Sequence, residues 1–202
     1  MRIKRQSKKL LNEAVRTLKN GGVILFPTDT VYGFLADAIN KKAVEKIYKI
    51  KNRPKSKPLA VFVKDIKMAK ELAEIDEPAF AKGLGEARQE KLLIKKWPGK
   101  YTFVLKRKKT LKLYDGGKNT IALRIPKHKL LNDLLKKINK PLVQTSANIS
   151  GQPALTKSSD IIKVFEGQKY KPDLIISAGN LPKRNPSAII DLTKDKINFL
   201  RR

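Results

Sequence analysis

Residues 21–33 read GGVILFPTDTVYG, and this stretch decides how the rest of the chain is interpreted. The apolar run at residues 23–26 is short, begins with β-branched residues and is closed by Pro27. Such a run is typical of a buried strand that ends in a loop. The loop residues 28–30 add two hydroxyls and a carboxylate at the strand end, which is where open α/β sheets bind ligands.

The flanking sequence alternates between helical and strand periodicity. Apolar residues at helical spacing predict helices at residues 7–20, 41–50, 66–75, 78–96, 129–138 and 157–165. Short apolar runs predict further strands at residues 59–63, 102–105, 120–125, 141–144, 174–177 and 188–192. This order predicts an α/β or α+β fold with one sheet, part of it parallel, and a single domain over residues 1–202.

Composition limits the class of protein. The 202 residues are 41% hydrophobic and hold no run long enough to span a membrane, so we expect a soluble protein without a membrane partner. The N-terminus lacks the apolar core of a secretion signal, which favours a cytoplasmic location. With no cysteine and only His128 as histidine, thiolate-based metal sites are excluded, and any metal would be an oxygen-liganded ion such as Mg²⁺.

The charge balance has two interpretations. Lys and Arg total 46 against 18 Asp and Glu, a formal charge of +28. An A·T-rich genome that spends lysine on solvated faces explains this, and so does contact with RNA phosphates or a nucleoside triphosphate. Composition alone does not separate the two.

The chain carries neither a P-loop nor a dinucleotide-binding glycine motif, so nucleotide chemistry must use scattered side chains. Thr28 and Asp29 are candidates, although both could simply satisfy backbone amides in a local turn. Lys51, Arg53 and Lys57 lie in a loop that prolines stiffen, and such a loop loses little entropy when its cations close on phosphate. A solvated basic loop is the alternative.

Two more clusters follow predicted strands. Residues 144–151 are rich in hydroxyl and amide groups, which suits a nest of donors for an anion. Arg124 lies in an otherwise apolar strand, and a buried arginine requires an acidic partner, either a protein carboxylate or that of a ligand. His128 is interpreted as a surface or packing residue.

Six motifs lie in order along nearly the whole chain: Gly21-Gly22 with residues 27–33, Lys51-Asn52-Arg53-Pro54 with Lys57-Pro58-Leu59, Trp97-Pro98-Gly99, Arg124-Ile125-Pro126, Ser146-Ala147-Asn148 and Pro186-Ser187. Together they resemble the YrdC family, the threonylcarbamoyl-AMP synthases, in its short single-domain form. The resemblance implies a twisted mixed parallel and antiparallel sheet flanked by helices, with a basic concave face. Phe62 stands where many members carry a histidine, Lys100 replaces a proline, and Ala188 stands where threonine is common.

The resemblance also implies site residues. Its characteristic tetrad falls on Lys51, Arg53, Ser146 and Asn148, which would bind the nucleotide, with Lys51 and Arg53 catalytic. By the same matching Lys57, Thr120 and Arg201 would help to hold ATP, while Thr30, Arg124 and Ser187 would hold threonine, with Arg124 meeting its carboxylate. The tetrad is then expected to converge on one cavity.

The implied reaction joins L-threonine, bicarbonate and ATP into threonylcarbamoyl-AMP and pyrophosphate, with Mg²⁺ accompanying ATP. The product would pass to separate threonylcarbamoyl transferase proteins for N6-threonylcarbamoyladenosine in tRNA, and tRNA or another RNA is a candidate partner. The alternative is a non-catalytic protein that binds double-stranded RNA or assists ribosome assembly by contacting phosphates.

Overall fold

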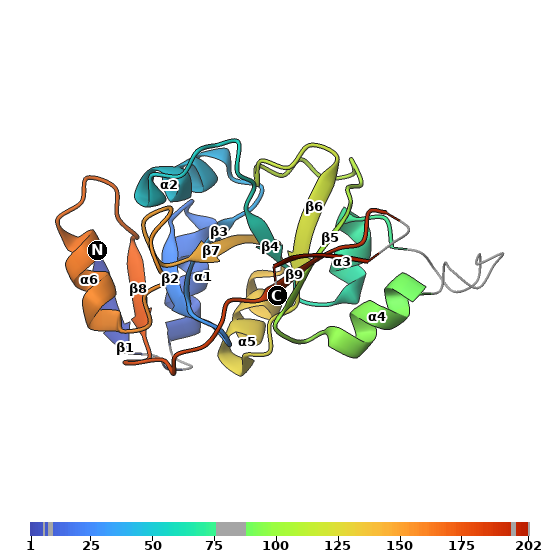
Figure 1. Cartoon of the computed structure of the whole chain (residues 1–202). Helices are drawn as coiled ribbons and strands as arrows, with labels where there is room; N and C mark the ends of the chain where they lie inside the picture. The colour runs from blue at the N-terminus through green and yellow to red at the C-terminus, as the bar shows by residue number, and fades with distance from the viewer. Residues whose placement is uncertain (6, 8–9, 76–87, 195–196, 202) are drawn as a thin grey trace.

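The computed structural model describes residues 1–5, 7, 10–75, 88–194 and 197–201 (Figure 1). Within these residues ten strands form one sheet in the order β1-β8-β2-β3-β7-β4-β6-β5-β9-β10. The strands are β1 (Arg2–Arg5), β2 (Ile24–Pro27), β3 (Tyr32–Asp37), β4 (Ala60–Phe62), β5 (Tyr101–Lys106), β6 (Thr120–Arg124), β7 (Leu142–Ser146), β8 (Leu174–Ser177), β9 (Ala188–Asp191) and β10 (Asn198–Arg201). The pairs β1–β8, β2–β8, β4–β6 and β5–β9 are parallel, and the other neighbours are antiparallel.

Helices cover both faces of this sheet (Figure 1). They are α1 (Leu11–Lys19), α2 (Lys41–Lys51), α3 (Ile66–Leu72), α4 (Arg88–Lys96), α5 (Lys129–Ile138) and α6 (Ser158–Glu166). Apolar residues of α1 and α5 form one core cluster with strand residues, while those of α2, α3, α4 and α6 belong to a second, larger cluster. The sheet is therefore the middle layer of three, and its central strands are buried on both faces.

The hairpin of β2 and β3 is the centre of the fold. Every residue of both strands is buried, and Phe26 pairs with Gly33 across the hairpin. A Cβ atom at Gly33 would lie 3.2 Å from the backbone oxygen of Thr145 in β7, so the close approach of these two strands favours glycine. The turn between β2 and β3 thus lies beside the end of β7.

The predicted fold class is confirmed, because the sheet is mixed and the helices flank it. The sequence analysis failed for three strands. Residues 32–37 were not predicted as a strand, because Tyr32 and Gly33 belong to the motif that was interpreted as a loop after Pro27. Strands β1 and β10 were not predicted, since both are fully exposed edge strands without an alternating apolar pattern.

The boundaries of the other elements agree with the predictions to within a few residues, with one reservation. The predicted helix at residues 78–96 corresponds to α4 from Arg88 onward, and residues 78–87 lie outside the described residues. No helix in the described part of the chain has the length and apolarity needed to cross a membrane. The predicted basic concave face stays a prediction.

Candidate functional site

A cavity of about 210 Å³ lies where several strands end, and six of the predicted residues line it: Thr30, Arg53, Arg124, Ser146, Ser187 and Arg201. They come from the β2–β3 turn, the loop after α2, the ends of β6, β7 and β10, and the residue before β9. Three of them are arginines, and no carboxylate is found among the described residues that line the cavity. The lining therefore suits an anionic ligand.

Arg124 is the largest fully buried side chain of the described residues, with 2% of its surface exposed. Its Nη2 donates to Asp29 Oδ1 at 2.6 Å and its Nε to the Gly99 carbonyl at 2.9 Å, while Phe62 lies 5.6 Å away with its ring face toward the guanidinium. Burial lowers the pKa of Arg124, and the charge of Asp29 opposes that shift. Nη1 has no hydrogen-bond partner within the described residues, so it is the donor left for a ligand.

The β2–β3 turn is held by hydroxyl groups. Thr28 Oγ1 donates to the Val31 carbonyl at 2.6 Å and accepts from the Thr30 backbone amide at 3.1 Å. The two threonine hydroxyls lie 3.0 Å apart. The local-turn interpretation is therefore correct for Thr28 but wrong for Asp29, which instead pairs with Arg124 across 95 residues of sequence.

A second pair of hydroxyls, from Thr102 and Ser187, also lines the cavity. Thr102 Oγ1 and Ser187 Oγ are 2.9 Å apart and both residues are buried. Arg201 donates through Nε to the Ser187 carbonyl at 2.9 Å and through Nη2 to its Oγ at 3.3 Å. The edge strand β10 is thereby fixed to the cavity wall.

Lys51 is buried, with 1% of its surface exposed, and contacts the cavity-lining Ser146. Its Nζ donates to the Ser146 carbonyl at 2.6 Å, the Asn148 carbonyl at 2.7 Å and Asn148 Oδ1 at 2.8 Å. Three acceptors match the three N–H groups of an ammonium. Ser146 Oγ also donates to Asn148 Oδ1 at 2.6 Å, so Lys51 and Asn148 hold Ser146 in place.

The end of α2 explains why Lys51 and Arg53 diverge. Asn52 has a left-handed backbone with φ of 49° and ends the helix, which turns the chain before Arg53. Arg53 then donates through Nε to the Lys57 carbonyl at 3.0 Å and through Nη2 to the Pro58 carbonyl at 2.8 Å. The proline loop is thus folded onto its own arginine, at the cavity.

Four predicted residues are not among those that line the cavity: Lys51, Lys57, Thr120 and Asn148. Lys51 and Asn148 are buried and bonded to the cavity-lining Ser146, whereas Lys57 and Thr120 are exposed. The tetrad does come together in space, but Arg53 and Ser146 alone of its four members reach the cavity. The roles assigned to all ten residues stay predictions.

The sequence analysis missed Thr102, Gln144 and Thr145 as lining residues. Thr102 is a hydroxyl residue within the apolar run of β5, and that isolated polarity was a usable signal. Gln144 and Thr145 belong to the polar cluster already noted, but they lie in β7 rather than in the loop after it.

Burial lowers the pKa of Lys51 to about 7, and the charge of Arg53 adds to this shift. Between that value and the ordinary 10.5, the unfolded chain binds a proton that the folded chain does not, so stability should rise with pH. We expect the contribution of Lys51 to rise by up to about 1 kcal/mol per pH unit in this window and to be constant below it.

Urea denaturation of the wild type and of Lys51→Met, at pH values between about 7 and 10.5, measures the contribution of Lys51 to stability. The difference in free energy of unfolding between them should change with pH. Parallel pH profiles would contradict the prediction.

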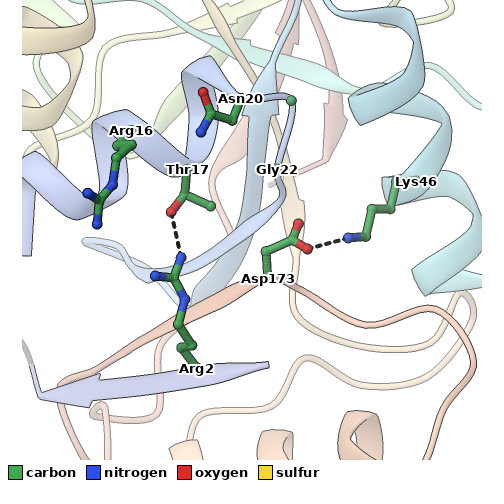
Figure 2. A pocket seen from close by; sticks show the side chains of 8 residues that line it. Arg2, Arg16, Thr17, Asn20, Gly22, Lys46 and Asp173 are labelled. Carbon is green, nitrogen blue, oxygen red and sulfur yellow. Dashed lines mark hydrogen bonds and ion pairs between the residues drawn. The ribbon is translucent and has the colours of Figure 1, made fainter.

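A second cavity, of about 400 Å³, lies between α1, α2 and the start of β8 (Figure 2). Asp173 accepts from Lys46 Nζ at 2.6 Å and from the Val23 amide at 2.7 Å, and Arg2 Nη2 donates to Thr17 Oγ1 at 3.2 Å. Both carboxylate oxygens are therefore used by the protein itself. This polar cluster joins β2, β8 and α2, and the described residues that line it include none of the predicted site residues.

The structure defines an α/β protein with a large mixed sheet and a cavity lined by three arginines. The model of the Sua5, YciO and YrdC family, which carries the description "Telomere recombination", matches residues 16–202. The chain belongs to this family, which confirms the resemblance found in the sequence.

Relatives of known structure share the fold. The crystal structure of Sua5 from P. abyssi complexed with L-threonine has a TM-score of 0.84 and 30% identity, and the match covers 99% of this chain and 56% of that one. E. coli YciO has a TM-score of 0.81 and 28% identity, with 100% of this chain and 93% of that one covered.

A curated relative carries the name threonylcarbamoyl-AMP synthase. This protein from Pyrococcus abyssi is 34% identical over 179 residues, which are 88% of this chain and 49% of the relative. The chain thus spans about half the length of that curated relative.

Proposed function

We propose that this chain is a threonylcarbamoyl-AMP synthase, a nucleotidyltransferase that joins L-threonine, bicarbonate and ATP and releases pyrophosphate. The observation that carries the proposal is a single cavity lined by Arg53, Arg201 and the buried Arg124, whose Nη1 has no partner within the described residues. A carboxylate and a triphosphate need such groups side by side. The name of the curated relative and the threonine bound to P. abyssi Sua5 support it.

For the amino acid, Arg124 Nη1 would donate to the carboxylate. Thr30 and Ser187 are 4% exposed, line the cavity and offer hydroxyls to the side chain and the amine of threonine. Thr102 would then keep the Ser187 hydroxyl oriented.

For the nucleotide, Arg53, Ser146 and Arg201 would contact the triphosphate from the cavity wall. Lys57 and Thr120, which are exposed, would reach it from the rim. Lys51 and Asn148 would act through Ser146, whose position they fix.

Mg²⁺ would enter with ATP. In the described residues no three carboxylate, histidine or cysteine side chains gather into a metal-binding group. We therefore assign the ion to the phosphate oxygens of ATP, where it would neutralise charge on the leaving pyrophosphate.

The chemistry needs little from the side chains beyond position and charge. The neutral threonine amine forms a C–N bond to the carbon of bicarbonate, and the bicarbonate hydroxyl leaves with an amine proton as water, which gives a carbamate. A carbamate oxygen then attacks the α-phosphorus of ATP in line with the departing pyrophosphate, which leaves with the electron pair of the broken P–O bond. The carbamate is already anionic, so this step needs no general base.

The product is a mixed anhydride whose acyl group must be transferred by another protein. We propose that separate threonylcarbamoyl transferase proteins pass it to tRNA, in the cytoplasm, where ATP and tRNA occur together. We also propose that residues 1–202 act as one domain, because strands from both ends of this range belong to one sheet.

Pyrophosphate release from the purified chain tests the function. Release should require ATP, threonine and bicarbonate together. A chain that releases none, and binds RNA with an affinity that falls steeply with salt, would favour the alternative of an RNA-binding protein.

Replacing threonine with close analogues should give graded rates. Serine lacks one methyl group, worth only about 1 kcal/mol, so it should support a rate within about one order of magnitude of threonine. Valine lacks the hydroxyl and would place a methyl group against the polar Thr30 and Ser187 side chains, so its rate should be near background. The same pyrophosphate assay compares the three, and equal rates with valine and threonine would contradict the assignment.

A further inference from the structure

We propose that Asp29 sets the ligand preference of the cavity: it compensates the charge of Arg124 and turns it into a directional donor for a carboxylate instead of a site for phosphate. This inference rests on the proposed function and adds a positioning residue to it. Asp29 does not line the cavity, and its side chain would touch neither substrate.

Hydrogen bonds fix the positions of Asp29 and of the Arg124 guanidinium. Both oxygens of the Asp29 carboxylate are held: Oδ1 accepts from Arg124 at 2.6 Å, and Oδ2 accepts from the Lys127 amide at 3.0 Å. The Asp29 carbonyl accepts from Arg184 Nη1 at 3.1 Å. With Gly99 on Nε, the guanidinium can take one orientation, and that orientation leaves Nη1 for the cavity.

Asp29 also neutralises the charge of Arg124. Arg53, Arg124 and Arg201 line one cavity of about 210 Å³, and the nearby Arg201 lowers the pKa of Arg124 by repulsion. Asp29 is 6% exposed and Arg124 is 2% exposed, so water screens this pair weakly. The pair is neutral as a unit, which leaves Arg53 and Arg201 to provide the net positive charge that a polyphosphate requires.

The two ligands should therefore respond in opposite directions when the Asp29 charge is removed. L-Threonine is a zwitterion without net charge, so it depends on the orientation of Arg124 and gains little from extra positive potential. Pyrophosphate carries several negative charges and depends mainly on that potential. A merely structural role for Asp29 would weaken the binding of both.

Calorimetric titration of L-threonine and, separately, of pyrophosphate into the full chain tests this. In Asp29→Asn we expect the Kd for threonine to rise by about 10- to 100-fold, as for a donor displaced by a fraction of an ångström. The Kd for pyrophosphate should fall by about tenfold, because one negative charge is lost beside the cavity. Asp29→Glu keeps the charge but moves the carboxylate, so it should weaken threonine and leave pyrophosphate unchanged.

The matched control is Asp37→Asn. Asp37 is also buried, at 3%, and is ion-paired to Lys140 at 2.6 Å, but Lys140, unlike Arg124, does not line the cavity. It should leave both constants unchanged. If Asp29→Asn does not fold, Asp29→Glu still decides whether position matters.

Three results would overturn the inference. Two concern Asp29→Asn: weaker binding of both ligands, or unchanged binding of pyrophosphate. The third is threonine binding by Asp29→Glu at the wild-type level. A wild-type chain that binds pyrophosphate but no threonine would contradict the proposed function instead. In that case the pyrophosphate titrations alone would still accept or reject the charge-compensating role of Asp29.

Discussion

Replacement of Lys51 by methionine should lower the free energy of unfolding by about 1–3 kcal/mol and abolish pyrophosphate release. Methionine fills a similar volume but donates no hydrogen bond. The carbonyls of Ser146 and Asn148 and the Asn148 Oδ1 atom would then lose the ammonium that all three now accept from. Of the three, the Asn148 carbonyl would be left without a partner among the described residues, which costs about 1–3 kcal/mol, whereas the Ser146 carbonyl keeps the Asn148 amide and Asn148 Oδ1 keeps Ser146 Oγ.

Urea denaturation below the pKa of Lys51, with the assay at the same pH, measures both effects. Lys42→Met is the control, because Lys42 lies on the same helix but is exposed. It should leave stability and rate nearly unchanged. Equal denaturation midpoints for the two variants would show that the ammonium of Lys51 does not hold the β7 loop.

Replacement of Arg124 by lysine should reduce kcat/KM for threonine by about 100- to 1,000-fold, as for the loss of one preorganised donor. The positive charge is kept, but a single ammonium cannot bind Asp29, the Gly99 carbonyl and a ligand carboxylate in a fixed plane. Binding of ATP should change little, since Arg53 and Arg201 remain.

Steady-state rates at varied threonine and varied ATP separate the two substrates. Arg16→Lys serves as the control, because Arg16 is exposed and lines the second cavity. If Arg124→Lys impaired ATP as strongly as threonine, Arg124 would not be the amino-acid group of the site.

The sequence predicted most of the fold because the buried elements carry clear periodicity. Residues 129–138 and 174–177 were predicted to the residue, since each is an uninterrupted pattern of one kind. Strand β3 was not predicted because Gly33 breaks its apolar pattern after one residue, although the close approach of Thr145 favours glycine there. Edge strands β1 and β10 are exposed at every residue, and exposure removes the contrast on which periodicity depends.

For the site, sequence reasoning identified residue types better than their roles. A buried arginine demanded an acidic partner, and Asp29 was available in a quoted motif, yet no sequence rule connects positions 29 and 124 before the strands are ordered. The burial of Lys51 could not be predicted from the sequence either. Its place depends on the left-handed Asn52, which ends α2 one residue later and sends Lys51 and Arg53 to different depths.

The hydrogen bonds around the cavity join residues far apart in the chain, such as Asp29 with Arg124 and Thr102 with Ser187. Contacts of long sequence separation form late in folding, because their loop-closure entropy must be overcome first. A nascent chain on the ribosome that still lacks Ser187 and Arg201 cannot form this cavity. Substrates can therefore bind and stabilise only the fully synthesised, folded chain. They would protect that chain from proteolysis but would not stabilise an incomplete one.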